Sequence, residues 1–208
     1  MVKQMRAART RRALVVAAAE IFADEGYALA TLPLISRRAG VSAGALHFHF
    51  ASKDALAAEV ESAATESAEK LAESCRSATG SSLQTLVDTV SGLLLAVAAD
   101  PMVRAGFRLC GDPSRKNEAQ MLCWWQRRVR DLVVEAQEAG ELTSAVSADA
   151  ATTAIVAAMV GFGALGMTDA TWLSTERLAQ FWTVLLPRLA ASLHHGAIPT
   201  AQRAEAAD

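Results

Sequence analysis

One stretch of the sequence constrains the fold more than any other. Residues 31–50, TLPLISRRAGVSAGALHFHF, have the pattern of two short helices joined by a tight turn. Gly40 stands where a left-handed residue ends a helix, and Ser42 follows as the N-cap of the next one. Leu46 and Phe50 are four residues apart and so share one side of that second helix. The pattern predicts a helix-turn-helix; its alternative is an ordinary buried helical hairpin.

The outward side of the second helix carries small residues, which suits DNA recognition. A recognition helix enters the major groove with its N-terminal residues nearest the base edges, and Ala43 and Gly44 would permit close approach. The first backbone amides and the Ser42 hydroxyl can bind phosphate, and His47 can donate to a second phosphate. The residues that we expect to contact DNA are Arg6, Arg9, Arg11, Thr31, Ser42, Ala43, Gly44, His47, His49 and Lys53.

Charge is unevenly distributed along the chain, although the formal net charge is only −2. Residues 1–56 hold eight basic and four acidic side chains, a balance of +4, which leaves 12 basic and 18 acidic side chains, a balance of −6, for the remainder. A basic N-terminal quarter on an acidic body suits a protein that brings one end to phosphates and keeps the rest away. The charge pattern therefore favours a nucleic-acid partner.

From residue 6 to about residue 61 the chain resembles the TetR-type transcriptional repressors. The features that carry the resemblance are Thr10-Arg11, Ala18-Ala19-Glu20, Phe22, Gly26-Tyr27, Thr31, Ile35, Ala39-Gly40-Val41, Gly44, Leu46, Phe48-His49-Phe50 and Lys53. The stretch GALHFHFASKDALA is most similar to the gamma-butyrolactone receptor branch, which usually carries Tyr where His47 stands and Lys where Ala43 stands. The resemblance implies a repressor that a small ligand releases from DNA.

Composition and periodicity favour an all-α protein. Strand formers are not clustered, and only 5 prolines and 12 glycines interrupt a sequence rich in alanine and leucine. Outside the helix-turn-helix we expect a basic arm at residues 3–12 that continues as a helix to residue 25, and further helices at residues 52–75, 82–99, 102–109, 114–139, 148–167 and 174–195, about nine in all.

These helices suggest two domains. A three-helix DNA-binding domain would occupy residues 1–52, and a larger ligand-binding and dimerisation domain residues 53–196. The helix at 53–75 would link them rigidly, so that a change of angle could be transmitted. Residues 197–208 are expected to form a disordered tail.

A mainly apolar pocket among the helices that begin near residues 83, 114 and 148 is the expected ligand site. Trp125 shares the apolar face of its helix with Val129, whereas Trp124 falls on a charged face, so Trp125 is the inward tryptophan. In receptors that the chain resembles, a tryptophan on this helix lines the ligand site; the alternative is a core tryptophan. The candidate ligand-binding residues are Trp125, Trp124, Leu86, Val90, Val129 and Phe162.

The last two helices carry more apolar surface than one core needs. They suggest a homodimer that buries them as a four-helix contact, as the resemblance also implies; the alternative is that the chain's own core absorbs both helices. A dimer would place two recognition helices about one DNA turn, roughly 34 Å, or somewhat more apart, so the expected target is a palindromic operator. The expected interface residues are Met159, Phe162, Phe181, Trp182, Leu185 and Leu189.

Other functions have little support in the sequence. Paired carboxylates, a metal-spaced His/Cys set, a nucleophile elbow and a phosphate loop are all missing, so we expect no enzyme, no cofactor and no metal. His194 and His195 are adjacent and would point about 100° apart on a helix. Cys75, Cys110 and Cys123 are odd in number and widely spaced, which indicates reduced thiols.

The sequence also bears on the location of the protein and on its ligand. Residues 150–167 reach the roughly 18 uncharged residues of a membrane-spanning helix, but their threonines and glycines favour a buried interface helix. The N-terminus lacks the apolar core of a signal peptide, so we expect a cytoplasmic protein without membrane contact. The ligand would be of the gamma-butyrolactone type; the alternative is a same-fold regulator that responds to a furan, an antibiotic or a biosynthetic intermediate.

Overall fold

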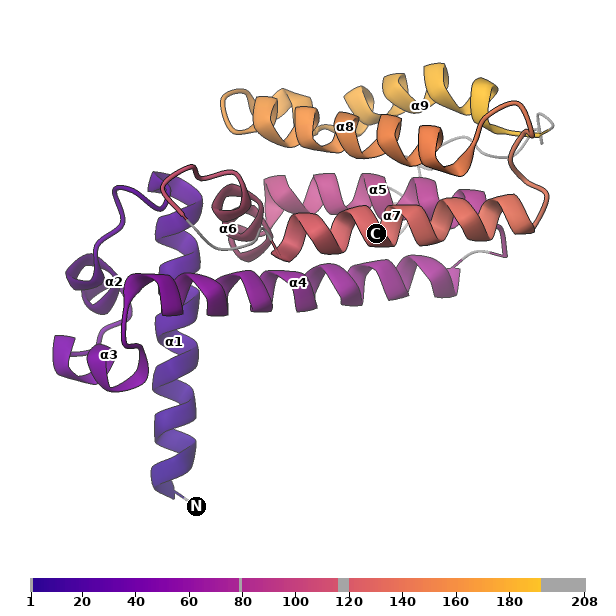
Figure 1. Cartoon of the computed structure of the whole chain (residues 1–208). Coiled ribbons are helices and arrows are strands. Elements are labelled where there is room, and N and C mark those ends of the chain that lie inside the picture. Colours follow the sequence, from indigo (N-terminus) through magenta and orange to yellow (C-terminus); the bar gives the residue numbers. More distant parts are fainter. Residues whose placement is uncertain (1, 79, 116–119, 192–208) are drawn as a thin grey trace, which may run out of the picture. The chain divides into compact units, whose positions relative to one another are not determined.

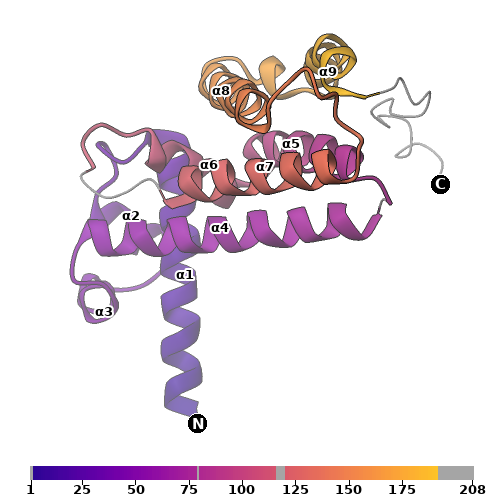
Figure 2. The same ribbon diagram turned by 45° about the vertical axis from the view of Figure 1, so that its right-hand side comes forward.

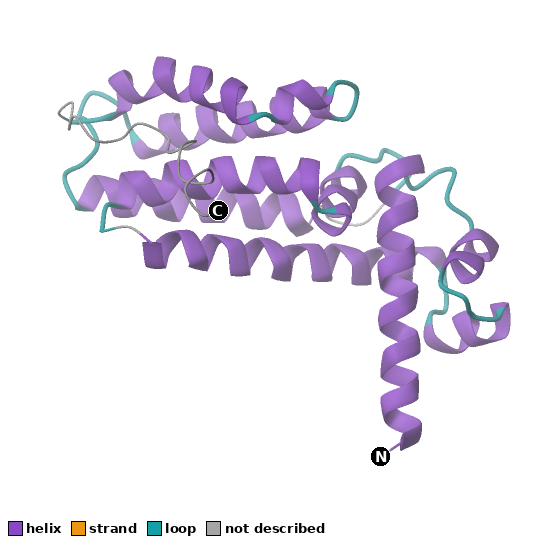
Figure 3. Ribbon diagram, turned by 180° about the vertical axis from the view of Figure 1, so that it is seen from behind, coloured by secondary structure: helices purple, strands orange, loops and turns teal. Residues whose placement is uncertain are grey.

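A computed structural model describes residues 2–78, 80–115 and 120–191, and these residues are mainly helical (Figure 1, Figure 3). Within them no strand occurs, and the one β-type pairing is an isolated bridge between Leu142 and Ala190. The prediction of an all-α protein is therefore confirmed. The helices are α1 Val2–Glu25, α2 Leu32–Arg38, α3 Ala43–His49, α4 Lys53–Ala78, α5 Ser82–Ala99, α6 Pro101–Cys110, α7 Gln120–Glu138, α8 Ala148–Gly166, the 3-10 helix η1 Ala170–Leu173 and α9 Thr175–Leu189.

Side-chain caps and one glycine set the ends of the two short helices, as the sequence predicts. Thr31 Oγ1 accepts the Leu34 N–H at 3.3 Å and begins α2, and Ser42 Oγ accepts the Ala45 N–H at 3.2 Å and begins α3. Between them Gly40 has a φ of 68°, in the left-handed region that glycine adopts without strain. The predicted helix-turn-helix is confirmed.

The chain divides into two compact units. The first comprises Met1–Ala68 and Ala99–Trp124, and the second comprises Glu69–Ala98 and Trp125–Asp208. The chain passes between them within α4, at the end of α5 and within α7. Contacts therefore group α6 with the helix-turn-helix, although the sequence placed it in the second domain. The functional domain boundary at residue 52 remains a prediction.

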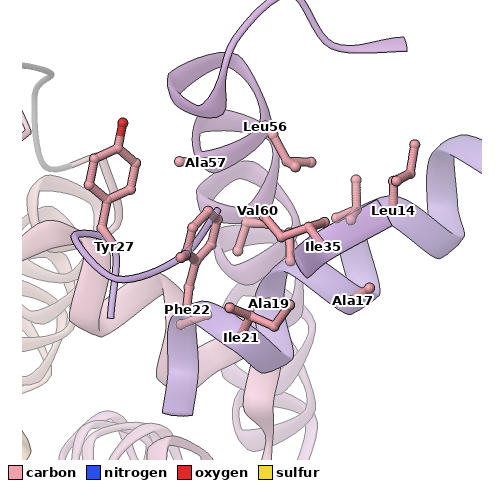
Figure 4. Packing of buried hydrophobic residues seen from close by; sticks show 14 of the residues in the cluster. Leu14, Ala17, Ala19, Ile21, Phe22, Tyr27, Ile35, Leu56, Ala57 and Val60 are labelled. Carbon is pink, nitrogen blue, oxygen red and sulfur yellow. The ribbon is translucent and has the colours of Figure 1, made fainter. Parts of the chain in front are cut away.

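One apolar core holds the first unit together. Side chains of α1, α2, α4 and α6 meet there, with Phe22 and Ile35 among them (Figure 4). α1 packs against α2, α3 and α6 (Figure 2). Leu46 and Phe50 attach α3 to this core and are only 1% and 3% exposed. Burial of each such side chain stabilises the fold by about 1.5–3 kcal/mol, so the position of α3 is fixed by its inner side.

The second unit contains α5, α8, η1 and α9, together with the C-terminal parts of α4 and α7. Trp182 of α9 is fully buried, and its Nε1 donates to Ser91 Oγ of α5 at 2.9 Å. Glu141 follows α7 and accepts the Leu83 N–H at 2.6 Å and the Ser81 hydroxyl at 2.9 Å. This carboxylate caps the N-terminus of α5, where a negative charge is favoured.

The start of α7 differs from the predicted helix at residues 114–139. Among the described residues α7 begins at Gln120, and neither Ser114 nor Arg115 is helical. The Asp112 carboxylate accepts the Ser114 N–H at 2.9 Å and so closes a turn where the sequence pattern predicted a helix.

The end of α9 also differs from the prediction, which extended the helix to residue 195. Ala190 adopts an extended conformation and forms the bridge with Leu142, and the Ala191 N–H donates to the Glu141 carbonyl at 2.9 Å. This pairing ends α9 at Leu189. The 3-10 helix η1 was not predicted. His194, His195 and the predicted tail at residues 197–208 lie outside the described residues.

Two helices are long and apolar enough to cross a membrane by composition alone, α5 and α8. Half of the apolar segment of α5 is buried by the chain itself, as in the core helix of a soluble protein. Only 28% of the apolar segment of α8 is buried. α8 and α9 lie side by side, and the rings of Phe162 and Phe181 join them with centroids 5.6 Å apart (Figure 1, Figure 2). α8 thus retains an apolar surface that the single chain leaves open.

Candidate functional site

α3 is buried on one side and exposed on the other. Ala43, Gly44 and His47 are exposed, as the sequence predicts. A Cβ atom placed on Gly44 would meet nothing closer than Ser42 Oγ at 4.0 Å. The chain's own packing therefore does not require glycine at this position, and the outer surface of α3 is open to a close partner.

Phe48 is a prominent residue of this surface that sequence reasoning missed. Its side chain is 82% exposed, and its ring contacts the half-buried His49 ring edge-on, with centroids 5.2 Å apart. Phe48 follows Gly44 by four residues, so helical spacing alone could have placed both on the same outward side. An exposed apolar side chain on a recognition helix can contact the methyl group of thymine.

The basic residues of α1 differ in how far they are engaged within the chain. Arg6 and Arg9 are exposed. Arg11 pairs with Glu59, and its guanidinium lies 5.1 Å from the centroid of the Phe50 ring. The hydrogen bond between the pair raises the pKa of Arg11 and lowers the pKa of Glu59. Arg6 and Arg9 are thus better placed than Arg11 to meet a DNA backbone.

Thr31 and Ser42 lie at the N-termini of α2 and α3 and are both exposed. Each side-chain oxygen already accepts a backbone N–H as a helix cap. A hydroxyl that accepts one hydrogen bond can still donate another, so both side chains keep a donor for phosphate.

Lys53 has a structural role that the sequence did not predict. Its Nζ donates to the Tyr27 carbonyl at 2.8 Å and to the Ala30 carbonyl at 3.0 Å. The same ammonium lies 4.1 Å from the centroid of the Tyr27 ring. Because an ammonium has three donors, these contacts leave at most one for a phosphate. Lys53 therefore holds the loop between α1 and α2 to the start of α4.

Four of the six candidate ligand-binding residues are core residues of the second unit. Leu86 and Val90 of α5 and Trp125 and Val129 of α7 are all at most 1% exposed. The predicted inward orientation of Trp125 is confirmed. Phe162 is half-buried against the rings of Trp172 and Phe181. Trp124 is half-buried and belongs to the first unit.

The predicted interface residues separate into two groups. Met159, Trp182 and Leu189 are at most 3% exposed in the single chain, so their side chains already pack in the core of the second unit, and their part in a dimer interface remains a prediction. Phe162, Phe181 and Leu185 remain partly exposed. The large apolar side chains exposed on α8 and α9 are Val160, Leu165 and Val184.

Within the described residues, the structure contains no group of three or more His, Cys, Asp or Glu side chains that could hold a metal ion. Cys75, Cys110 and Cys123 all lie in these residues and form no disulfide. Burial raises the pKa of Cys110 to about 11, which disfavours its thiolate.

Comparison with known proteins agrees with this geometry. Residues 14–60 match the family described as bacterial regulatory proteins, tetR family. The chain is 34% identical over 199 residues to the A-factor receptor protein of Streptomyces griseus, an alignment that covers 95% of the chain and 69% of that protein.

Solved structures give the same result. A crystal structure of a gamma-butyrolactone receptor (ArpA-like protein) is similar with a TM-score of 0.72 and 28% identity over 89% of this chain and 90% of that one. The TetR family protein CprB from Streptomyces coelicolor, in complex with its biological operator sequence, is similar with a TM-score of 0.75 and 26% identity over 90% of this chain and 92% of that one.

We predict that Tyr27 titrates late and that its ionisation destabilises the fold. Burial and the hydrogen bond from its hydroxyl to Asp54 Oδ1 at 2.6 Å raise the pKa of Tyr27 to about 12. A raised native pKa adds stability below the unfolded value near 10, and this stability is lost as the pH rises toward 12. The chain contains one tyrosine, and its four tryptophans do not titrate in this range, so the change of near-ultraviolet absorbance with pH follows this group alone.

The matched variant is Tyr27→Phe, which removes the hydroxyl. It should lower the free energy of unfolding by about 1 kcal/mol at neutral pH and flatten the loss of stability between pH 10 and 12. An absorbance titration of the native protein centred near pH 10 would contradict this account of the site.

Proposed function

The chain belongs to the TetR family of bacterial DNA-binding regulators, and on that basis we propose that it binds a palindromic operator as a homodimer and is released by a small apolar ligand. The relatives named above are regulators of transcription, and we propose no enzymatic role. The observation that carries most weight is the exposed outer side of α3, where small residues stand at the start of a helix whose inner side is fixed in a core.

DNA binding would use two kinds of contact. Ala43 and Gly44 would allow the backbone of α3 to approach base edges in the major groove. Arg6 and Arg9 are exposed and would meet phosphates, together with the hydroxyl groups of Thr31 and Ser42, His47 and the remaining donor of Lys53. His49 is half-buried beside Phe48, and we propose for it a supporting contact at the same surface.

Dimer formation would cover the apolar surface that α8 and α9 leave open. Val160, Leu165 and Val184 are 38%, 43% and 77% exposed, and the half-buried Phe162, Phe181 and Leu185 lie on the same two helices. An exposed apolar surface of this kind on a soluble protein marks an interaction site. A second copy of the chain is the partner that would give the twofold symmetry of a palindrome.

The ligand would bind in the apolar interior of the second unit. Leu86, Val90, Trp125 and Val129 supply buried apolar side chains from two helices, as sites for small apolar ligands require. The A-factor receptor protein and the gamma-butyrolactone receptor among the relatives support a ligand of the butyrolactone type. A furan, an antibiotic or a biosynthetic intermediate is the second candidate class.

Release from the operator requires only that the ligand binds two conformations of the protein with different affinities. Suppose that the ligand has a roughly 100-fold higher affinity for the conformation that does not fit the operator than for the conformation that does. The equilibrium between the two conformations then shifts by about 2.7 kcal/mol, enough to empty most operator sites. A regulator of this kind acts where DNA is, so we propose a cytoplasmic protein.

Close approach of α3 to DNA can be tested at Gly44. Gly44→Ala should leave the fold intact or slightly more stable, because the Cβ atom meets open space and alanine favours a helix by about 1 kcal/mol over glycine. The same methyl group would clash with base edges, so affinity for a DNA duplex selected by the wild-type protein should fall by about tenfold or more. Gly80→Ala is the matched control, because Gly80 is exposed in the second unit and a Cβ atom there would also meet open space, so this variant should keep wild-type affinity. Equal affinities of the two variants would place α3 away from the groove.

The proposed dimer contact can be tested at Val184. Val184→Glu should shift sedimentation from dimer to monomer, because it would bury a charge in the proposed interface. Leu29→Glu is the control, because Leu29 is 71% exposed on the first unit and Val184 is 77% exposed. If Val184→Glu and Leu29→Glu sediment alike as dimers, the contact lies elsewhere.

The proposed contact between Trp125 and the ligand can be tested by removing the indole ring. Trp125→Leu keeps the site apolar but removes the indole ring, so release of the selected duplex by an acyl-substituted gamma-butyrolactone should need at least about tenfold more ligand. DNA affinity without the ligand should be unchanged, and Trp124→Leu should respond like the wild type. An unaltered response of Trp125→Leu would remove this residue from the site and leave it a core tryptophan.

A further inference from the structure

Residues 104–115, which contain most of α6 and the turn after it, attach to the C-terminal end of α1. Arg108 Nη1 donates to the Ala23 carbonyl at 2.8 Å and to the Asp24 carbonyl at 3.0 Å. These carbonyls lie in the last turn of α1, where backbone acceptors have no partner within the helix. Arg104 adds an ion pair of 3.8 Å with the Asp24 carboxylate. α6 thus caps the helix that leads into the loop before α2.

The turn after α6 contacts this loop at Tyr27. The Asp112 carboxylate accepts hydrogen bonds from Ser114 and from the Tyr27 backbone N–H. Burial raises the pKa of Asp112, but these bonds and the nearby Arg115 outweigh it and hold the pKa below its ordinary value. Asp112 is therefore ionised at neutral pH and is a charge-assisted acceptor for the loop.

Arg115 reaches from the same turn into the interior of the first unit. Its Nη2 lies 2.7 Å from Glu61 Oε2, and the two side chains are 3% and 2% exposed. Its guanidinium lies 5.6 Å from the centroid of the Tyr27 ring. The thiol of Cys110 donates to the other Glu61 oxygen at 3.5 Å. The other ion pairs of the described residues are much more exposed, so burying this one incurs a desolvation penalty that the others avoid.

Tyr27 is the point where these contacts meet those of α4. Its N–H bonds Asp112, its carbonyl bonds Lys53 and its hydroxyl bonds Asp54, so each of its polar groups is engaged. The loop from Tyr27 to Thr31 leads directly into α2, and α2 carries α3 through the turn at Gly40. Any freedom at Tyr27 would therefore become freedom in the direction of α3.

We propose that Asp112 and Arg115 are positioning residues for operator binding, which act through Tyr27 to fix the orientation of the helix-turn-helix. The inference rests on the DNA-binding function proposed above, and neither residue is expected to touch DNA. α5 precedes this segment and α7 follows it, and both continue into the second unit. The segment is thus a covalent route by which a change in the second unit would reach the recognition helix.

The main test distinguishes an effect on the orientation of the helix-turn-helix from an effect on the stability of the fold. Replacement of a buried ion pair by apolar side chains is often neutral or stabilising, whereas removal of one partner is not. The double variant Glu61→Leu/Arg115→Met should therefore melt at or near the wild-type temperature. Its affinity for a duplex that the wild-type protein selects from random DNA should nevertheless fall by about tenfold or more, because α3 loses its fixed orientation. The slope of log affinity against log salt should not change, since no phosphate contact is lost.

The control double variant is Arg76→Met/Glu135→Leu, which removes an ion pair of 2.8 Å whose side chains are 43% and 37% exposed. It should bind the same duplex with wild-type affinity. A second pair of variants tests the turn: Asp112→Ala should weaken binding, and Asp112→Asn, which keeps an oxygen acceptor for the Tyr27 N–H, should restore most of it.

Amide hydrogen exchange of residues 26–31 supplies a readout without DNA. Exchange should be faster in Glu61→Leu/Arg115→Met than in the wild type, because the loop has lost one of its attachments. Wild-type affinity and wild-type exchange in that variant would overturn the inference, and so would a salt slope lower by about one, which would make Arg115 a phosphate contact. Failure of the wild-type protein to select any duplex would instead refute the proposed function, while the exchange result would still decide whether the attachment exists.

Discussion

The DNA-facing part of the molecule depends on the burial of two side chains beneath α3. α3 has seven residues, too few to persist as an isolated helix in water. Leu46 and Phe50 give it a fixed position by packing into the core of α1, α2, α4 and α6. Gly40 supplies the left-handed turn that brings α2 and α3 together. With the inner side fixed in this way, the outer side can keep small and exposed residues that contribute nothing to the core.

The basic N-terminal quarter has two distinct uses. Arg6 and Arg9 are exposed, whereas Arg11 pairs with Glu59 and Lys53 bonds two carbonyls of the loop before α2. Net charge therefore overestimates the number of cations that are fully available to DNA. The engaged cations still raise the local positive potential, and they also order the backbone that carries α3.

Local patterns made much of this structure predictable. Caps at Thr31 and Ser42 and the turn at Gly40 depend on neighbouring residues, so the sequence identifies them directly. Contacts between distant residues were not predictable in the same way. The pairing of Arg115 with Glu61 joins residues far apart in the chain and takes Arg115 out of the helix in which periodicity had placed it.

Contacts between distant residues were also unpredictable in the second unit and at the candidate DNA-binding surface. Helical spacing identified Trp125 as inward, but it could not show that Trp182 is buried within the same chain and donates a hydrogen bond to Ser91. Phe48 was missed although spacing placed it beside Gly44, because a phenylalanine is expected in a core. Its exposure is visible only once the inner side of α3 is known.

The protein has two exposed surfaces of consequence, a recognition helix on one unit and an open apolar face on α8 and α9 of the other. The two surfaces are related, because a palindrome bound by two copies of α3 requires a contact between chains. The most direct test is the stoichiometry of the complex with a duplex that the protein selects from random DNA, measured by sedimentation at two salt concentrations. We predict two chains, or a multiple of two, on a palindromic duplex, with an affinity that falls steeply as salt increases. One chain on a duplex without symmetry, or an affinity insensitive to salt, would contradict the account.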